Sequence, residues 1–318
     1  MYTPALTTPT VENLVVAIRD DLIGGAADMA RETARAFAAL ARDDSVSDAD
    51  FSERLDDAIK AIIEVTPSIM PVTRVLHAVA AAAEADVDDP RGAIAAAAEA
   101  FVSWLDAGLD QIAEIGADLI RDGDRLFLYS MSSTVYRMIE AALARGKRVS
   151  VVTTESRPTN EGLVTLERLC PQGISVDIGI DAAMTPLMRD CTAVYVGSDD
   201  VTSAGDCLAK VGCFATALVA RRYGIPYYIA GDSSKFDPSS LRGVPVKIRE
   251  MEASLIVSGS LPQGGRVRNP VFELVPADLI TAYVTELGIL HPGAVYQVMA
   301  SVPWNERVGE LVARSNRA

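Results

Sequence analysis

The sequence predicts an α/β protein in which a helical N-terminal domain precedes a Rossmann-like, doubly wound and mostly parallel sheet. Residues 1–120 show helical periodicity and no strand-like run. Beyond residue 121, short β-rich runs alternate with helical stretches, an order typical of parallel β-α-β units. The run Ala193–Gly197 is apolar and β-rich, as expected of a buried parallel strand. We therefore expect domains at residues 1–120 and 121–318.

The first domain is predicted to contain helices throughout. Thr66-Pro67-Ser68 ends one helix and can begin the next, because a residue before proline avoids helical backbone angles. Gly24 and Gly25 permit two segments to approach closely ahead of a long helix. The expected helices are residues 11–18, 28–42, 56–64, 72–83 and 92–116.

The turn cluster Arg121–Asp124 marks the change of pattern. The last two expected helices each begin with a proline, which suits a first helical turn. Strands are expected at residues 126–129, 149–153, 174–180, 193–197, 227–230 and 253–257. Helices are expected at residues 134–145, 161–169, 182–189, 206–222, 276–287 and 292–299.

The charge balance argues against two classes of partner. The 318 residues carry a formal net charge of −14. Phosphate contacts to a nucleic acid need a basic patch, and an acidic surface is repelled by anionic lipid, so we expect neither nucleic acid nor membrane as a partner. The longest uncharged stretch, residues 287–304, is broken by Pro292 and Gly293 and makes a poor membrane span.

Cysteine usage points to a reducing compartment. The four cysteines form no CxxC pair, and only two histidines are present to join them, which argues against a zinc site. The first residues lack a basic region followed by an apolar core, so no secretory signal is recognised. We expect a cytoplasmic protein with free thiols, no metal and no cofactor.

The strongest candidate for chemistry is the stretch that follows the strand at residues 193–197. Asp199 would lie at the carboxyl end of that strand, where open α/β sheets bind ligands, with Lys210 in the expected helix behind it. A carboxylate and an ammonium facing one crevice suit a phosphorylated, proton-exchanging substrate. The alternative is that Asp199 only caps a loop and Lys210 is a solvated helix residue.

A serine-rich loop follows the first strand. The hydroxyls of Ser130, Ser132 and Ser133, with the backbone N–H groups of the next helix, make a plausible phosphate cradle. Ser132 or Ser133 would also serve as an N-cap, which serine does routinely. Both roles can hold together.

Two further strand ends carry cations. Arg157 can grip a phosphate with two N–H groups, or it can pair with Glu155 or Asp199. Lys235 is a second candidate for phosphate, although a charge after a strand is often only solvated. Cys213 could be a nucleophile, but a buried structural thiol is favoured. The expected convergence of these groups on one rim indicates a small phosphorylated polyol, with Asp199 as acid or base.

Six strings carry a resemblance to a known family. In order along the chain they are TESRP, DAAM, VGSDDV, AKVG, GIPYYIA and NPVFELVP. The set resembles the translation initiation factor 2B α, β and δ subunits, a family that includes methylthioribose-1-phosphate isomerase and ribose-1,5-bisphosphate isomerase. The resemblance is clear from Arg125 to Pro292. It implies a helical N-terminal domain, a Rossmann-like C-terminal domain and a homodimer built from the C-terminal domains.

In the isomerases of this family, an acid and a cysteine move hydrogen between C2 and C1 of an aldose 1-phosphate and give a ketose. The resemblance implies that Asp199 is that acid. It implies that Lys210, Arg157 and Lys235 bind the phosphorylated substrate, and that Gly24 and Gly25 mark a further substrate-binding position near the N-terminus.

Four positions depart from the family pattern. Met131 stands where the isomerases have the cysteine, and it cannot transfer a proton. Ala209 replaces an asparagine, and Gly24 and Val65 replace two arginines. We therefore consider two functions: an enzyme related to ribose-1,5-bisphosphate isomerase, and a non-catalytic regulatory protein akin to the initiation-factor subunits. The expected ligand is a phosphorylated sugar or a nucleotide-derived small molecule. A third alternative, a structural dimer partner with an empty crevice, is disfavoured by the retained cations.

Overall fold

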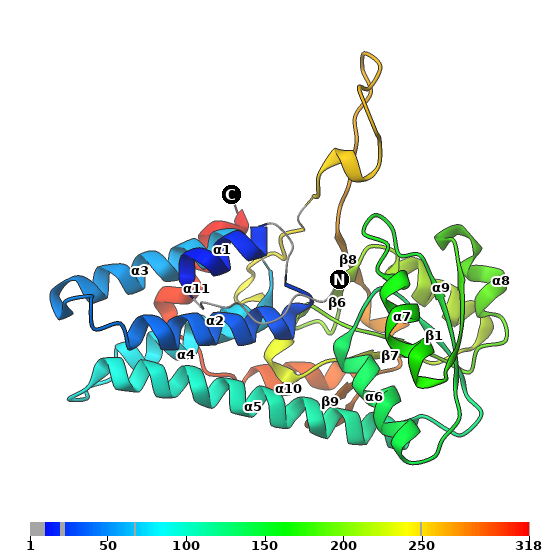
Figure 1. Cartoon of the computed structure of the whole chain (residues 1–318), viewed down its shortest axis with the longest axis horizontal. Coiled ribbons are helices and arrows are strands. Elements are labelled where there is room, and N and C mark those ends of the chain that lie inside the picture. The colour runs from blue at the N-terminus through cyan, green and yellow to red at the C-terminus, as the bar shows by residue number, and fades with distance from the viewer. Residues whose placement is uncertain (1–9, 20–22, 67, 249, 318) are drawn as a thin grey trace. The chain divides into compact units, whose positions relative to one another are not determined.

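The computed structural model describes residues 10–19, 23–66, 68–248 and 250–317 (Figure 1). The chain forms two compact units. The first contains residues up to 107, 234–247 and 297–318, and the second contains residues 108–233 and 248–296. The domain boundary predicted at residue 120 stays a prediction. The helical unit also contains two later segments of the chain, residues 234–247 and 297–318.

The first unit is built from helices, as the periodicity predicts. Its elements are α1 (Val11–Arg19), α2 (Ala26–Ala41), α3 (Asp48–Val65), α4 (Met70–Ala83), α5 (Pro90–Leu119) as far as residue 107, and α11 (Glu306–Arg317). The helix α2 packs against α4, α1 against α2 and α3, and α11 against α3 and α4.

Local chemistry sets the beginnings of these helices. Ser47 caps α3, because its side chain accepts a hydrogen bond from the backbone N–H of Asp50. Pro71 lies in the first turn of α4, where its missing N–H costs nothing. Gly25 precedes α2 with φ +81°, a left-handed angle that favours glycine. Large side chains such as Phe37 and Leu76 are fully buried in the core of this unit.

The second unit contains the predicted parallel sheet. Among the described residues, seven strands form one sheet in the order β10-β9-β7-β4-β1-β2-β3. Only the edge pair β9–β10 is antiparallel; the other pairs are parallel. The strands are β1 (Arg125–Leu128), β2 (Ser150–Thr154), β3 (Ser175–Gly179), β4 (Ala193–Val196), β7 (Tyr227–Ala230), β9 (Ala282–Thr285) and β10 (Gly288–Leu290).

Helices connect these strands and confirm the α/β fold. They are α6 (Ser133–Ala144), α7 (Gly162–Leu169), α8 (Met184–Met188) and α9 (Cys213–Tyr223), and α10 (Val295–Met299) follows the last strand. The central strand β4 is buried at every residue, between β1 and β7, which explains its uninterrupted apolar sequence.

A second, smaller sheet corrects the sequence-based assignment of residues 206–222. Residues expected to begin a helix instead form β6 (Cys207–Lys210), which pairs antiparallel with β5 (Asp200–Val201) and with β8 (Phe272–Val275). Cys207, Leu208 and Ala209 are all buried, so a short apolar run was mistaken for part of the helix that follows. Lys210 therefore ends a strand, and α9 begins three residues later.

Two expectations near the C-terminus are also wrong. Residues 253–257, expected as a strand, contain the 3₁₀ turn Ala253–Leu255. Residues 276–287, expected as a helix, contain the 3₁₀ turn Ala277–Leu279 and then β9, which pairs in parallel with β7. The β-prone run Ala282–Thr285 is fully buried there, so tertiary pairing overrides the helical start suggested by Pro276.

Candidate functional site

The polar residues of the second unit gather at the carboxyl ends of β1, β2 and β4. Asp199 follows β4, and its backbone N–H donates to the carbonyl of Leu208 on β6 at 2.9 Å. This bond connects the end of the central strand to β6, the strand of the small sheet that ends in Lys210. The Asp199 side chain is half-buried. Asp199 and Lys210 both influence the thiol of Cys213 electrostatically, so their charges lie in the same neighbourhood.

Lys210 is held by a carboxylate that the sequence analysis did not single out. Its ammonium lies 2.6 Å from Glu161 Oε1, with side-chain exposures of 10% for Lys210 and 22% for Glu161. Thr159 Oγ1 lies 3.0 Å from the same carboxylate oxygen and 3.3 Å from Lys210 Nζ. The hydroxyl of Ser130 donates to Glu161 Oε2. We call these four residues the Glu161 cluster.

A network of hydrogen bonds holds the loops that carry the Glu161 cluster. Asp181 accepts hydrogen bonds from Thr154 Oγ1 at 2.7 Å, from the Ser156 N–H at 2.9 Å and from the Arg157 N–H at 2.8 Å. Ser156 Oγ accepts from the backbone N–H of Ser130 at 2.8 Å. Ser130 and Ser156 have φ angles of +63° and +57°, which non-glycine residues rarely adopt outside functional or turn positions.

Ser132 and Ser133 lie at the start of α6, where the sequence analysis expected one of them to cap the helix. Ser132 caps α6, because its Oγ accepts from the N–H of Val135 at 3.3 Å. Ser133 is the first residue of that helix. A Cβ on Gly197 would lie 2.8 Å from Ser132 Oγ, so glycine is needed where the end of β4 passes this loop. A phosphate-binding role for Ser132 and Ser133 stays a prediction.

Arg157 is exposed, and its guanidinium is engaged by backbone. Its Nη2 donates to the carbonyl of Leu255 at 2.7 Å. Leu255 belongs to the extended segment of residues 250–270, drawn in yellow and orange in Figure 1, which the Glu250–Pro270 bridge closes at its base. The guanidinium has further N–H groups that can donate to a phosphate. The predicted contact of Arg157 with phosphate stays a prediction.

The N-terminus of α9 is occupied by a side chain of the protein itself. Glu273 Oε1 accepts from the N–H of Gly212 at 2.6 Å and of Phe214 at 2.8 Å. Burial raises the pKa of the adjacent Cys213 thiol well above its usual range, and the Glu273 and Asp199 carboxylates raise it further. A neutral, fully buried thiol is a poor nucleophile, which favours the structural interpretation of Cys213.

Three predicted residues lie in the first unit. Lys235 ends the 3₁₀ turn Ser233–Lys235 and is only 5% exposed. Gly24 is half-buried, and Gly25 is the residue that precedes α2. Their convergence with the Glu161 cluster stays a prediction.

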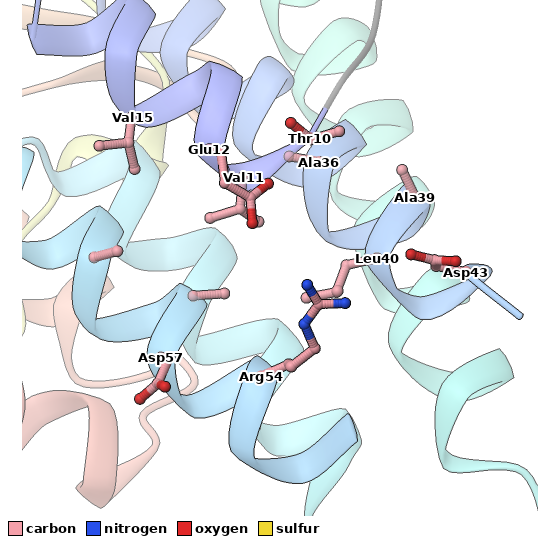
Figure 2. Close-up of a pocket in the computed structure, with 12 residues that line it drawn as sticks. Thr10, Val11, Glu12, Val15, Ala36, Ala39, Leu40, Asp43, Arg54 and Asp57 are labelled. Carbon is pink, nitrogen blue, oxygen red and sulfur yellow. The ribbon is translucent and has the colours of Figure 1, made fainter. Parts of the chain in front are cut away.

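The first unit also contains a pocket of about 570 Å³ between α1, α2 and α3 (Figure 2). Val11, Val15 and Leu40 contribute apolar walls, and Figure 2 shows the Arg54 side chain reaching toward Leu40. None of the 12 lining residues drawn there was predicted as a site residue.

In the ranges that the structure describes, no group of three His, Cys, Asp or Glu side chains is placed to hold a metal ion. One described helix, α5, is long and apolar enough to cross a membrane by length and composition. Its buried residues Ile94, Ala98, Leu105, Leu109 and Ile112 recur at helical spacing, a stripe typical of a core helix.

Comparison with known proteins assigns the family. Residues 22–292 match the model of the initiation factor 2 subunit family. The chain belongs to this family. It is 31% identical over 293 residues to a protein of Archaeoglobus fulgidus named ribose 1,5-bisphosphate isomerase, a match that covers 92% of this chain and 91% of the relative. It is 30% identical over 282 residues to a Pyrococcus furiosus protein named putative translation initiation factor eIF-2B subunit 2-like, covering 89% and 96% of the two chains.

Solved structures of the family share this fold. The translation initiation factor eIF-2B of Pyrococcus horikoshii superimposes with a TM-score of 0.79 at 29% identity, covering 89% of this chain and 97% of that one. The 5-methylthioribose 1-phosphate isomerase of the same organism gives a TM-score of 0.71 at 19% identity, covering 92% and 88%, which supports the fold alone.

Sequence reasoning missed Glu161, Thr159 and Glu273, and the supporting residues Ser156 and Asp181. Glu161 was assigned to the beginning of a helix, where acids are common on electrostatic grounds alone. Its spacing from Ser130 and Lys210 in the sequence gives no hint of contact. Only the parallel pairing of β1 with β2 brings the two loops together.

Proposed function

We propose that this protein is a sugar-phosphate isomerase that converts an aldose 1-phosphate into the corresponding ketose phosphate, in the manner of ribose-1,5-bisphosphate isomerase. Asp199 is the acid or base that moves the carbon-bound proton, and Lys210 holds the substrate. A homodimer in the cytoplasm, without metal or cofactor, belongs to the same proposal.

Two observations together support the proposal: the similarity of the chain to named isomerases, and the polar residues at the carboxyl edge of its sheet. Relatives named ribose 1,5-bisphosphate isomerase match this chain over nine-tenths of its length. At the carboxyl edge of its parallel sheet, the chain keeps an acid, a lysine and hydroxyl groups close together. This is the edge at which open α/β sheets bind ligands.

The test is turnover. Ribose 1,5-bisphosphate is incubated with the protein in D₂O, and formation of a ketose is monitored by proton NMR. A proton-transfer route should place deuterium at C1. Asp199→Asn should reduce turnover ~10²–10⁴-fold with binding kept, because loss of one acid–base group has a cost of that order. Asp278→Asn removes an exposed acid of the same unit as a control. Turnover by Asp199→Asn at the wild-type rate would remove Asp199 from the chemistry.

Substrate binding by Lys210 is tested separately by calorimetry. Lys210→Met should weaken ribose 1,5-bisphosphate binding by at least tenfold, because a charged partner that is 90% buried is lost. An undiminished affinity would contradict that role.

A non-catalytic, regulatory protein that binds a sugar phosphate or a protein partner is the second candidate, favoured by Met131 at the position of the isomerases' cysteine. Relatives named as eIF-2B subunits belong to the same family. A thermal shift with sugar phosphates without any turnover would favour it.

A further inference from the structure

We propose that Glu161 is a catalytic residue of this site, the base that takes the proton from the C2 hydroxyl of the sugar phosphate. The inference rests on the proposed function and adds to it the second proton-transferring group. Isomerisation of an aldose phosphate needs such a group besides Asp199, and Met131 cannot supply it.

The position of Glu161 is the first reason. Its carboxylate accepts a hydrogen bond from Ser130, the residue that directly precedes Met131, and pairs with Lys210 at the end of β6. It is 22% exposed, so a ligand at the carboxyl edge of the sheet can touch it.

The way the carboxylate is held is the second reason. Lys210 Nζ and Thr159 Oγ1 both contact Oε1, and Ser130 Oγ contacts Oε2. The ammonium at 2.6 Å and the two hydroxyls fix the orientation of the carboxylate at the edge of the sheet. Oε2, which accepts from Ser130 alone among the described contacts, keeps a lone pair for a substrate hydroxyl.

The loop that aims Ser130 is the third reason. Ser130 and Ser156 keep left-handed backbone angles that carry strain, and the hydrogen bond from Ser130 N–H to Ser156 Oγ joins them. Asp181 anchors Ser156 in turn. Strained non-glycine residues held in this way collect at functional sites.

The reaction balances with these two carboxylates and water. Asp199 takes the proton from C2, the C2–H pair forms a C1=C2 bond, and the C1–O4 bond pair passes to the ring oxygen, which takes a proton from water. Asp199 then returns its proton to C1, and the C1=C2 pair forms the new C1–H bond. Glu161 takes the C2 hydroxyl proton as that O–H pair becomes the second bond of C2=O, and it releases this proton to water. C2 is oxidised as C1 is reduced, so no other oxidant is needed.

The experiment compares three variants of the full chain with ribose 1,5-bisphosphate. Glu161→Gln keeps the size and one hydrogen-bonding oxygen but removes the base. Glu161→Asp keeps the carboxylate on a shorter side chain. Glu167→Gln removes an exposed charge from the same helix and serves as the matched control.

We expect kcat of Glu161→Gln to fall ~10²–10⁴-fold beyond any change in Kd measured by calorimetry, with the urea midpoint lowered because Lys210 loses its charged partner. Glu161→Asp should recover at least about tenfold of that loss.

Each contrary result has a distinct meaning. A Glu161→Gln variant with wild-type kcat, or with a loss confined to Kd, would overturn the role of Glu161 and leave the isomerase proposal standing. Glu161→Asp no better than Glu161→Gln would overturn proton transfer by this carboxylate. Absence of turnover in the wild type, in a sample that binds the sugar phosphate, would overturn both.

Discussion

Gly212 precedes α9, two residues after Lys210, and we expect its replacement by alanine to be far more costly than the same change at Gly224. Gly212 has φ +104°, and a Cβ there would lie 1.9 Å from Tyr129 Oη and 2.4 Å from Tyr129 Cζ. Tyr129 is itself 3% exposed, and its hydroxyl donates to the carbonyl of Val211 at 3.0 Å. The ring therefore has little freedom to move away.

Gly224 ends the same helix and provides the control. It has φ +68°, and a Cβ there would meet no atom within 4 Å. Gly224→Ala should lower the free energy of unfolding by about 1–2 kcal/mol, the cost of a left-handed angle for a residue with a Cβ. Gly212→Ala should carry that cost plus about 1–3 kcal/mol for overpacking against Tyr129. The expected total is about 2–5 kcal/mol.

Urea unfolding followed by circular dichroism measures the difference between the two variants. For a unit of 150–250 residues, each kcal/mol corresponds to a Tm shift of about 2–4 °C. Gly212→Ala should also weaken sugar-phosphate binding, because the displaced backbone carries Lys210. Equal destabilisation by the two substitutions would refute the close approach of Tyr129 to Gly212.

Two further predictions concern stability. Glu273→Ala should lower the free energy of unfolding by about 2 kcal/mol, because two backbone N–H groups at the start of α9 lose their acceptor, and urea unfolding of Glu273→Gln should show a smaller loss. Burial lowers the pKa of His77 from 6.5 to about 3, so below pH 6.5 the unfolded chain binds a proton that the native chain does not. The stability advantage of wild type over His77→Gln should therefore shrink by about 2 kcal/mol between pH 6.5 and pH 5. A pH-independent difference would show that the native chain takes up the His77 proton as readily as the unfolded chain, and would contradict the lowered pKa.

The parallel strands of the second unit could be predicted because each is short, apolar and followed by a helix. The strand at residues 227–230 was predicted with its observed bounds. Strand β9 could not be predicted, because Pro276 and the residues after it resemble a helix start, and only the neighbouring strand β7 selects the extended form.

Some residues of the candidate site could likewise be predicted from the sequence, whereas their contacts could not. Asp199 and Ser130 could be chosen from their residue types and their places after apolar runs. Lys210 was chosen as a cation of the helix expected behind the central strand, although it ends a strand. The ion pair joins residues that are distant in sequence: Lys210 ends a strand of the small sheet, and Glu161 directly precedes α7. A single sequence contains no measure of that proximity.

The sequence by itself determined the α/β class, the order of most strands and helices, and the family, because these depend on local patterns of apolar residues and on short motifs. The tertiary structure decided that residues 207–210 are a strand, that Glu273 caps α9 and that Glu161 holds Lys210. These features depend on which buried backbone groups find partners and which charges are brought together once the strands pair.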